Sequence, residues 1–148
     1  DLSGSMIYSS PLQRCLQLAE FLSEQSELSQ HPLKPKSAIT QDSRLKELDF
    51  GSWEMKPWDE IPKKDFDHWA HDYVQIAPPD GESLSTMRAR VMSFMSELPD
   101  AKHVIVTHSG VIRILWAHWH QKSIQEAFDQ KIEFGQICSY IDKNGPEF

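Results

Sequence analysis

The stretch at residues 103–107, HVIVT, constrains the fold more than any other part of the sequence. A short run of β-branched apolar residues without polar alternation is typical of a strand buried on both faces of a sheet. HSG follows this run, and residues 110–120 then show the spacing of a helix. A buried strand followed by a helix is a building unit of parallel sheets, so we expect an α/β fold.

A second strand–turn–helix unit opens the chain. We expect a strand over 5–8, with Ser10 as an N-cap and Pro11 at the first helical position, where a missing N–H costs nothing. The other predicted elements are a helix over 10–25, a loop over 26–37, strands over 37–40 and 134–142, an irregular loop over 45–54, short helices within 57–73, a turn at 77–83, and helices over 83–97 (capped by Ser83), 110–120 and 123–129. This alternation predicts an α/β/α sandwich of three layers around a mostly parallel sheet.

Length and charge narrow the class of protein. We expect residues 1–148 to form a single domain, which is long enough for a sizeable core. A net charge of −7 argues against nucleic acid or an anionic membrane as the main partner, but not against a small anion. No stretch approaches the ~20 apolar residues of a membrane span, and Cys15 and Cys138 lack CxxC spacing. We therefore expect a cytoplasmic protein with two buried thiols.

His108 stands where the predicted strand over 103–107 leaves the sheet, ahead of Ser109 and Gly110. In open α/β sheets, ligands bind outside the carboxyl ends of the strands. A histidine at that position can donate a hydrogen bond or a proton to an anion. The alternative is a histidine that only caps the turn and packs, which is the role that we expect for His103 at the other end of the strand.

Arg14 lies in the first turn of the predicted helix after IYSSP. A helix N-terminus opposes a cation and favours an anion, so local propensity does not explain this arginine. A bound phosphate or carboxylate would explain it, because the planar guanidinium grips such groups with two bonds. The alternative is a surface arginine that is paired with a nearby acid.

The loop LKELDFGSWE contributes Glu47, Asp49 and Glu54. A carboxyl group near two cationic side chains and a phosphate can act as a general acid or base, although acids in loops are usually solvated surface. The histidine pairs at 68/71 and 118/120 have no matching third ligand and no HExxH pattern, so no metal site is predicted.

Four segments in this order, IYSSPLQRC, LKELDFGSWE, PPDGES and VIVTHSGVIR, with FGQICSY as the closing strand, resemble the histidine phosphatase family, the phosphoglycerate mutase-like phosphatases. The resemblance implies attack of a histidine on a phosphate monoester, followed by hydrolysis of the phosphohistidine, without metal or cofactor. On the matching positions, Arg14 binds phosphate, His108 supports the transferring phosphoryl group, and Glu47 protonates the leaving oxygen. Ser109 and Gly110 belong to the substrate-binding turn, and Ser109 replaces the more usual glycine.

One part of the family pattern is missing. The family begins with a central strand that ends in Arg-His-Gly and carries the nucleophile, but this sequence has no Arg-His pair and only six residues before IYSSPL. The resemblance therefore implies a chain without the first strand and helix, with unpaired sheet edges and no turnover of its own. The alternative is a natural pseudoenzyme that binds a phosphorylated ligand or partner protein.

Within the family, LKELDFGSWE and PPDGES most resemble the alpha-ribazole phosphatases of cobalamin assembly. The resemblance thus implies a small phosphorylated metabolite as partner, with a phosphoglycerate mutase or a broad-range phosphatase as the alternative. Residues 55–80 are expected to form a lid. The aromatic residues of this segment include Trp58, Trp69 and Tyr73, and Trp53 lies just before it. They could stack on a benzimidazole of the substrate, or they could only pack the lid onto the sheet.

Overall fold

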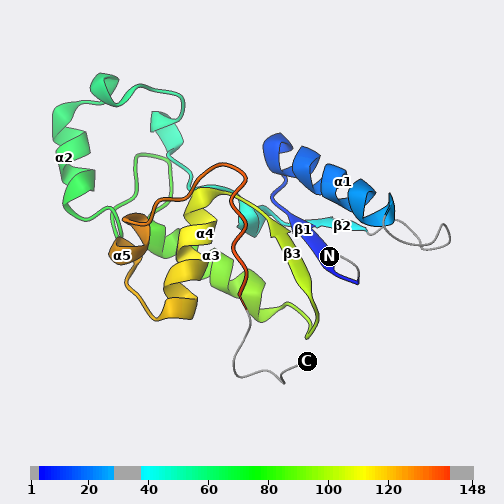
Figure 1. Ribbon diagram of the computed structural model, residues 1–148. Coiled ribbons are helices and arrows are strands. Elements are labelled where there is room, and N and C mark those ends of the chain that lie inside the picture. Colours follow the sequence, from blue (N-terminus) through cyan, green and yellow to red (C-terminus); the bar gives the residue numbers. More distant parts are fainter. Residues whose placement is uncertain (1–3, 29–37, 141–148) are drawn as a thin grey trace.

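The computed structural model of the protein describes residues 4–28 and 38–140 (Figure 1). Within these ranges, β1 (Met6–Ser9), β2 (Ile39–Gln41) and β3 (His103–Val106) form one sheet with the order β2-β1-β3. Both pairings are parallel, and Ser9 lies opposite Gln41 on one side and Val106 on the other. The carboxyl ends of the strands therefore lie at the same edge of the sheet.

Helices cover both faces of this sheet, with α1 on one face and α3 and α4 on the other (Figure 1). The helices are α1 (Gln13–Leu28), α2 (Lys63–His71), α3 (Leu84–Ser96), α4 (Ser109–His120) and α5 (Ile124–Phe128), and short 3-10 turns occupy Ser43–Leu45 (η1), Gly51–Trp53 (η2) and Trp58–Glu60 (η3). In the part of the chain that the structure describes, no helix combines the length and the apolar character needed to cross a membrane. The predicted α/β architecture is confirmed.

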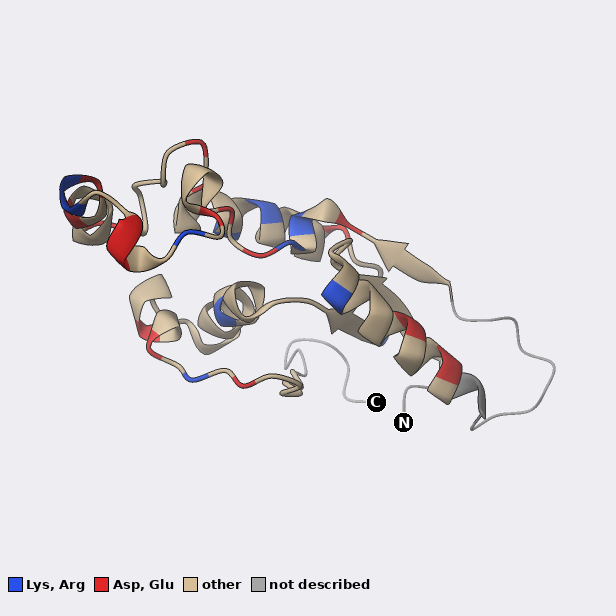
Figure 2. Cartoon of the chain, turned by 90° about the horizontal axis from the view of Figure 1, so that it is seen from above, with Lys and Arg blue, Asp and Glu red and all other residues tan. Residues whose placement is uncertain are grey.

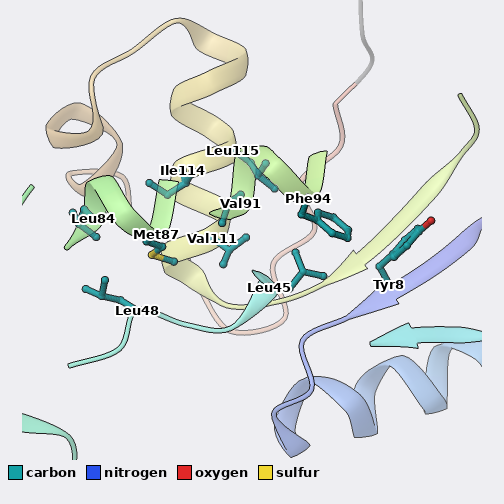
Figure 3. Close-up of a cluster of buried hydrophobic side chains, with 10 residues drawn as sticks. All are labelled: Tyr8, Leu45, Leu48, Leu84, Met87, Val91, Phe94, Val111, Ile114 and Leu115. Carbon is teal, nitrogen blue, oxygen red and sulfur yellow. The ribbon is translucent and has the colours of Figure 1, made fainter. Parts of the chain in front are cut away.

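The side chains of β1 alternate between the two layers of helices. Ile7 packs with Cys15 and Ala19 of α1, whereas Tyr8 meets the ring of Phe94 on α3 edge-on at 5.3 Å. The larger buried cluster lies on this second side (Figure 3); its members are Tyr8, Leu45, Leu48, Leu84, Met87, Val91, Phe94, Val111, Ile114 and Leu115. This core fixes α3 and α4 against the sheet.

The predicted cap of α3 is confirmed, whereas the predicted start of α1 is wrong. The Ser83 hydroxyl accepts a hydrogen bond from the Thr86 N–H at 3.2 Å and caps α3, as predicted. The predicted helix over 10–25 instead spans Gln13–Leu28, so Ser10 is not its N-cap and Pro11 is not its first residue. The reason is that the Ser10 N–H still donates to the Val106 carbonyl at 2.9 Å and extends the sheet ladder. The first residues of the predicted loop over 26–37 are consequently helical, and residues 29–37 of that loop lie outside the described residues.

The strand predicted over 134–142 is wrong for residues 134–140, and its last two residues lie outside the described ranges. Gly135 has a φ of +71°, and Phe134 and Ile137 are exposed. The ring of Tyr140 stacks on Trp119 of α4 with 4.0 Å between centroids. A strand needs a sheet edge to satisfy its backbone groups, and this segment lies against a helix instead. Cys138 is therefore half-buried in a loop rather than buried on a strand.

The expectation of a strand buried on both faces is only partly right for β3. Val106 is buried, but the three residues before it are half-buried. Among the described residues, β3 pairs with β1 alone, so it is an edge strand. An edge position leaves one row of backbone groups and the flanking side chains accessible.

A matched pair of substitutions tests this core. Ile114 is fully buried on α4 and Ile137 is 89% exposed. We expect Ile114→Val to lower the free energy of unfolding by about 1 kcal/mol, because it removes one buried methylene group and leaves a small cavity. Ile137→Val should leave the free energy unchanged in urea denaturation, and equal effects of the two variants would contradict the packing described here.

Candidate active site

The pairing of β1 with β3 brings three polar side chains together at the carboxyl edge of the sheet. His108 follows β3, and Ser10 and Arg14 follow β1. The His108 Nε2 lies 2.8 Å from the Ser10 Oγ, and the Arg14 Nε donates a hydrogen bond to the His108 Nδ1 at 3.2 Å. An arginine has only donors, so the Nδ1 must be the acceptor. Neutral His108 therefore carries its hydrogen on Nε2 and donates it to Ser10.

Burial and neighbouring charge set the protonation of His108. Its side chain is 6% exposed. Burial lowers the pKa of the imidazole below its ordinary value of 6.5, the Arg14 guanidinium and more distant Arg90 lower it further, and the Glu47 carboxylate opposes them. His108 is thus neutral at pH 7, and an anion bound beside it would favour its protonated form.

Arg14 stands in the first turn of α1 and is exposed. Its contact with His108 is its single hydrogen bond in the described residues, which leaves the terminal Nη groups open to a ligand. No carboxylate of the described ranges pairs with it, so the alternative of an acid partner is not supported there. Figure 2 shows how charge is distributed along α1: the first turn is basic, and acidic residues lie farther along the helix.

Cys15 completes the surroundings of His108. Its thiol is buried and lies 3.4 Å from the His108 Nε2. Burial is the main cause that raises the pKa of this thiol, so Cys15 stays protonated and acts as a small packing group beneath the imidazole.

Glu47 reaches the same edge from the loop after η1. Its Oε2 accepts hydrogen bonds from the Gly110 N–H at 3.2 Å and from the Ser109 hydroxyl at 3.3 Å, while its Oε1 accepts from the Leu48 N–H at 3.0 Å. The N-terminus of α4 therefore holds this carboxylate, in the polarity that a helix favours. A Cβ at position 110 would overlap the Glu47 side chain, which explains the glycine.

The other two acids of this loop do not join the site. The Asp49 carboxylate accepts from the Gly51 N–H at 2.8 Å, and the Glu54 carboxylate accepts from the Phe50 N–H at 2.9 Å. Both hydrogen bonds are exposed and stabilise the loop itself. Of the three candidates, Glu47 alone is brought to His108, Ser109 and Gly110.

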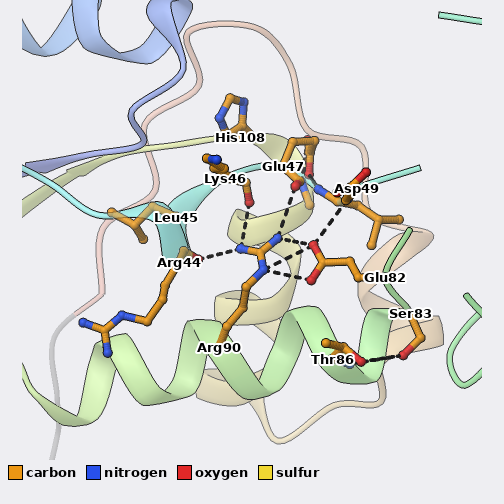
Figure 4. A network of polar contacts seen from close by, with 12 residues as sticks. Arg44, Leu45, Lys46, Glu47, Asp49, Glu82, Ser83, Thr86, Arg90 and His108 are labelled. Carbon is orange, nitrogen blue, oxygen red and sulfur yellow. Dashed lines mark hydrogen bonds and ion pairs between the residues drawn. The ribbon is translucent and has the colours of Figure 1, made fainter. Parts of the chain in front are cut away.

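Two residues at or beside the site, Ser10 and Arg90, are not predicted from the sequence in these roles. The sequence pattern indicates Ser10 only as a helix cap. In the structure its hydroxyl accepts from the Leu12 N–H at 3.3 Å, ahead of the start of α1 at Gln13, and lies 2.8 Å from the His108 Nε2. No sequence motif indicates Arg90, although it binds the backbone of the loop that carries Glu47 (Figure 4). The signal was its place on the apolar face of α3, three residues after buried Met87, where a charged side chain needs a partner.

The predicted lid contains α2 and a cluster of aromatic rings. Trp58 and Trp69 stack with 5.9 Å between centroids, and Trp53 and Tyr73 pack against Trp69. Figures 1 and 2 both place α2 at the opposite end of the molecule from α1. These rings pack on one another, and their contact with a substrate stays a prediction.

In the described ranges, no three potential metal ligands lie close enough together to hold an ion.

The geometry at the sheet edge agrees with the result of a family comparison. Residues 1–143 match the sequence profile of the histidine phosphatase superfamily, branch 1. The chain belongs to this superfamily.

Three similar proteins illustrate the relationship. The adenosylcobalamin/alpha-ribazole phosphatase of Salmonella typhimurium is 30% identical over 115 residues, and the match covers 73% of this chain and 52% of that protein. Phosphoserine phosphatase 1 of Hydrogenobacter thermophilus is 28% identical over 119 residues, with 75% and 52% covered. The crystal structure of the alpha-ribazole phosphatase from Shigella flexneri superposes with a TM-score of 0.70 at 23% identity and covers 90% of this chain and 65% of that one. The chain spans about half the length of the curated relatives it matches.

The lowered pKa of His108 predicts a pH dependence of stability. Because the unfolded histidine titrates near 6.5 and the folded one lower, its contribution to stability is complete above pH 6.5 and is lost as the pH falls through the folded pKa. We expect urea denaturation between pH 7 and pH 5 to show a fall in the free energy of unfolding that is smaller in His108→Gln.

The exposed His118 supplies the control for this measurement. His118→Gln should retain the full wild-type pH dependence. A His108→Gln variant with the same dependence as the wild type would contradict the burial of a neutral imidazole.

Proposed function

We propose that this chain carries the phosphate-binding and proton-transfer groups of a phosphomonoester hydrolase. The observation that supports this most strongly is the convergence of Arg14, Ser10 and His108 at one point, with Glu47 held beside them at the N-terminus of α4. A phosphate ester placed there meets donors on one side and a carboxyl group on the other.

Arg14 and His108 serve the phosphoryl group. The free Nη groups of Arg14 bind two of its oxygens. A dianion raises the proton affinity of His108; the Nδ1, once protonated, gives up its hydrogen bond from the Arg14 Nε and donates to a third oxygen. These donors stabilise the charge that spreads over the equatorial oxygens in the transition state. Metal-free phosphoryl transfer depends on such fixed donors.

Glu47 moves the proton. A histidine nitrogen attacks phosphorus, the bond from phosphorus to the alcohol oxygen breaks, and protonated Glu47 gives its proton to that oxygen. In the second step a water oxygen attacks phosphorus, Glu47 takes the proton of that water, and the phosphorus–nitrogen bond breaks. Phosphate leaves and both residues return to their starting states.

The attacking histidine is not among the residues described at this site. The sequence holds no Arg-His pair, which is the family's signature of the nucleophile. We therefore propose that these 148 residues bind phosphate but do not turn over, and that activity belongs to a form that includes an Arg-His-Gly segment.

Alpha-ribazole 5′-phosphate is the substrate that we propose. Support comes from the Salmonella relative, which is 30% identical to this chain, and from the loop motifs LKELDFGSWE and PPDGES. Phosphoserine is the second candidate, because a phosphoserine phosphatase matches over a similar length at 28% identity. The exposed Trp58 offers a stacking surface for an aromatic base, which favours the first candidate.

Phosphate binding by the 148-residue chain tests the first half of this proposal. In calorimetric titration with inorganic phosphate, we expect Arg14→Gln to weaken binding by about tenfold or more, because charge-assisted hydrogen bonds are lost. Arg88→Gln, a change at an exposed arginine of α3, should bind like the wild type. Equal binding by all three proteins would remove the phosphate site.

Phosphate release tests the second half. We expect release from alpha-ribazole 5′-phosphate by a form extended with the gene's own sequence upstream of Asp1, if that sequence encodes Arg-His-Gly, and none from the 148 residues alone. Turnover by the short chain that is abolished in His108→Ala would refute the assignment of the nucleophile. Phosphate binding without turnover in either form would favour a binding protein, and faster release from phosphoserine would favour the second substrate.

A further inference from the structure

Arg90 uses every donor of its guanidinium group inside the protein. Its Nη1 donates to the carbonyls of Arg44 at 2.6 Å and Lys46 at 2.9 Å, and its Nη2 donates to the carbonyl of Glu47 at 3.1 Å and to the Glu82 carboxylate. Its Nε donates to Glu82 as well, at 3.0 Å. All five guanidinium N–H groups thus have an acceptor. Three of these acceptors are backbone carbonyls of residues 44–47.

Glu82 completes this contact from the far side. The Arg90 and Glu82 side chains are 19% and 16% exposed, so the pair is largely removed from solvent. The Glu82 Oε1 also accepts from the Asp49 N–H at 3.3 Å, and the Glu82 N–H donates to the Asp49 carbonyl at 2.9 Å. Together the two side chains hold the loop from residue 44 to residue 49.

This loop presents Glu47 to the site. The Glu47 backbone carbonyl is bound by Arg90 (Figure 4). The Glu47 carboxylate is bound at the N-terminus of α4 through the Gly110 N–H. Arg90 itself is fixed because its neighbours on α3, Met87 and Val91, are fully buried. The position of the carboxylate relative to His108 therefore depends on a rigid link from the core through Arg90 to the loop.

We propose that Arg90, held by Glu82, is a positioning residue for Glu47. The proposal rests on the function proposed above, in which Glu47 transfers the proton. A lysine cannot reproduce the contact, since a single ammonium group cannot bind three carbonyls and a carboxylate in the planar arrangement of a guanidinium. A shift of the loop by about 1 Å is sufficient to cost a proton transfer about a hundredfold in rate.

Kinetics of a form that turns over provide the first test. We expect Arg90→Lys to lower kcat for the phosphate ester by tenfold to a hundredfold with KM within a factor of two, because phosphate is bound by Arg14 and His108. Glu82→Gln should show the same split with a smaller loss. Both variants should also flatten the limb of the pH–rate profile that depends on Glu47.

The chain offers a matched control for each variant on the same helix. Arg88→Lys changes an exposed arginine two positions away. Glu97→Gln disrupts another Arg–Glu pair at the end of α3, in which the Arg44 Nη1 and the Glu97 Oε1 are 2.7 Å apart and Glu97 is 63% exposed. Both controls should keep wild-type kcat, KM and pH profile.

A second readout does not need turnover. The Gly110 N–H donates to the Glu47 carboxylate, so its ¹⁵N chemical shift in the 148-residue chain should titrate with that carboxyl group and lose the titration in Glu47→Gln. Arg90→Lys and Glu82→Gln should abolish or shift this titration, and the two controls should not.

The two readouts separate the possible failures. Wild-type titration of Gly110 in Arg90→Lys and Glu82→Gln would overturn the positioning role, whatever the activity. A changed titration in a protein that hydrolyses no phosphate ester would support the positioning role and reject the proposed function. If Arg90→Lys does not fold, the Gly110 titration in Glu82→Gln, which keeps the arginine, tests the positioning role.

Discussion

The parallel pairing of β1 with β3 is the constraint on which the rest of the site depends. Ser9 lies opposite Val106, and the Ser10 N–H continues the ladder to the Val106 carbonyl beyond the end of the strand. This bond fixes where the two chains leave the sheet. A change of register by one residue would turn the alternating side chains of β1 to the other layer and separate Ser10 from His108.

The sequence was sufficient for those parts of the site that depend on local order. His108 follows an apolar strand, and Arg14 occupies a helical turn where only an anion would favour it; both were found at the edge where parallel strands end. Arg90 could not be assigned in the same way, because three of its acceptors are backbone carbonyls more than 40 residues away in sequence. The double role of Ser10 also required the tertiary structure, since its cap signal hides the contact with His108.

The error at residues 134–140 has a similar cause. Apolar residues there, such as Phe134 and Ile137, have a strand-like composition, but a strand forms only when another edge supplies hydrogen bonds. In the described residues Tyr140 stacks on Trp119 instead, and β3 keeps one edge without a partner strand. Local composition therefore identified a tendency, and the availability of a partner decided the structure.

Two arginines and one carboxylate are the charged groups that act on the pKa of His108, although the chain as a whole is acidic. The chain has a net charge of −7, yet Arg14 and Arg90 both lower the pKa of His108, after burial, while Glu47 alone opposes them. The N-terminus of α4 neutralises part of that single carboxylate. A small dianion at this edge thus interacts chiefly with Arg14 and His108, whereas a large polyanion would also meet the net negative charge of the chain. Because exposed charges are screened beyond about 8 Å at physiological ionic strength, binding of a small phosphate ester is compatible with an acidic protein.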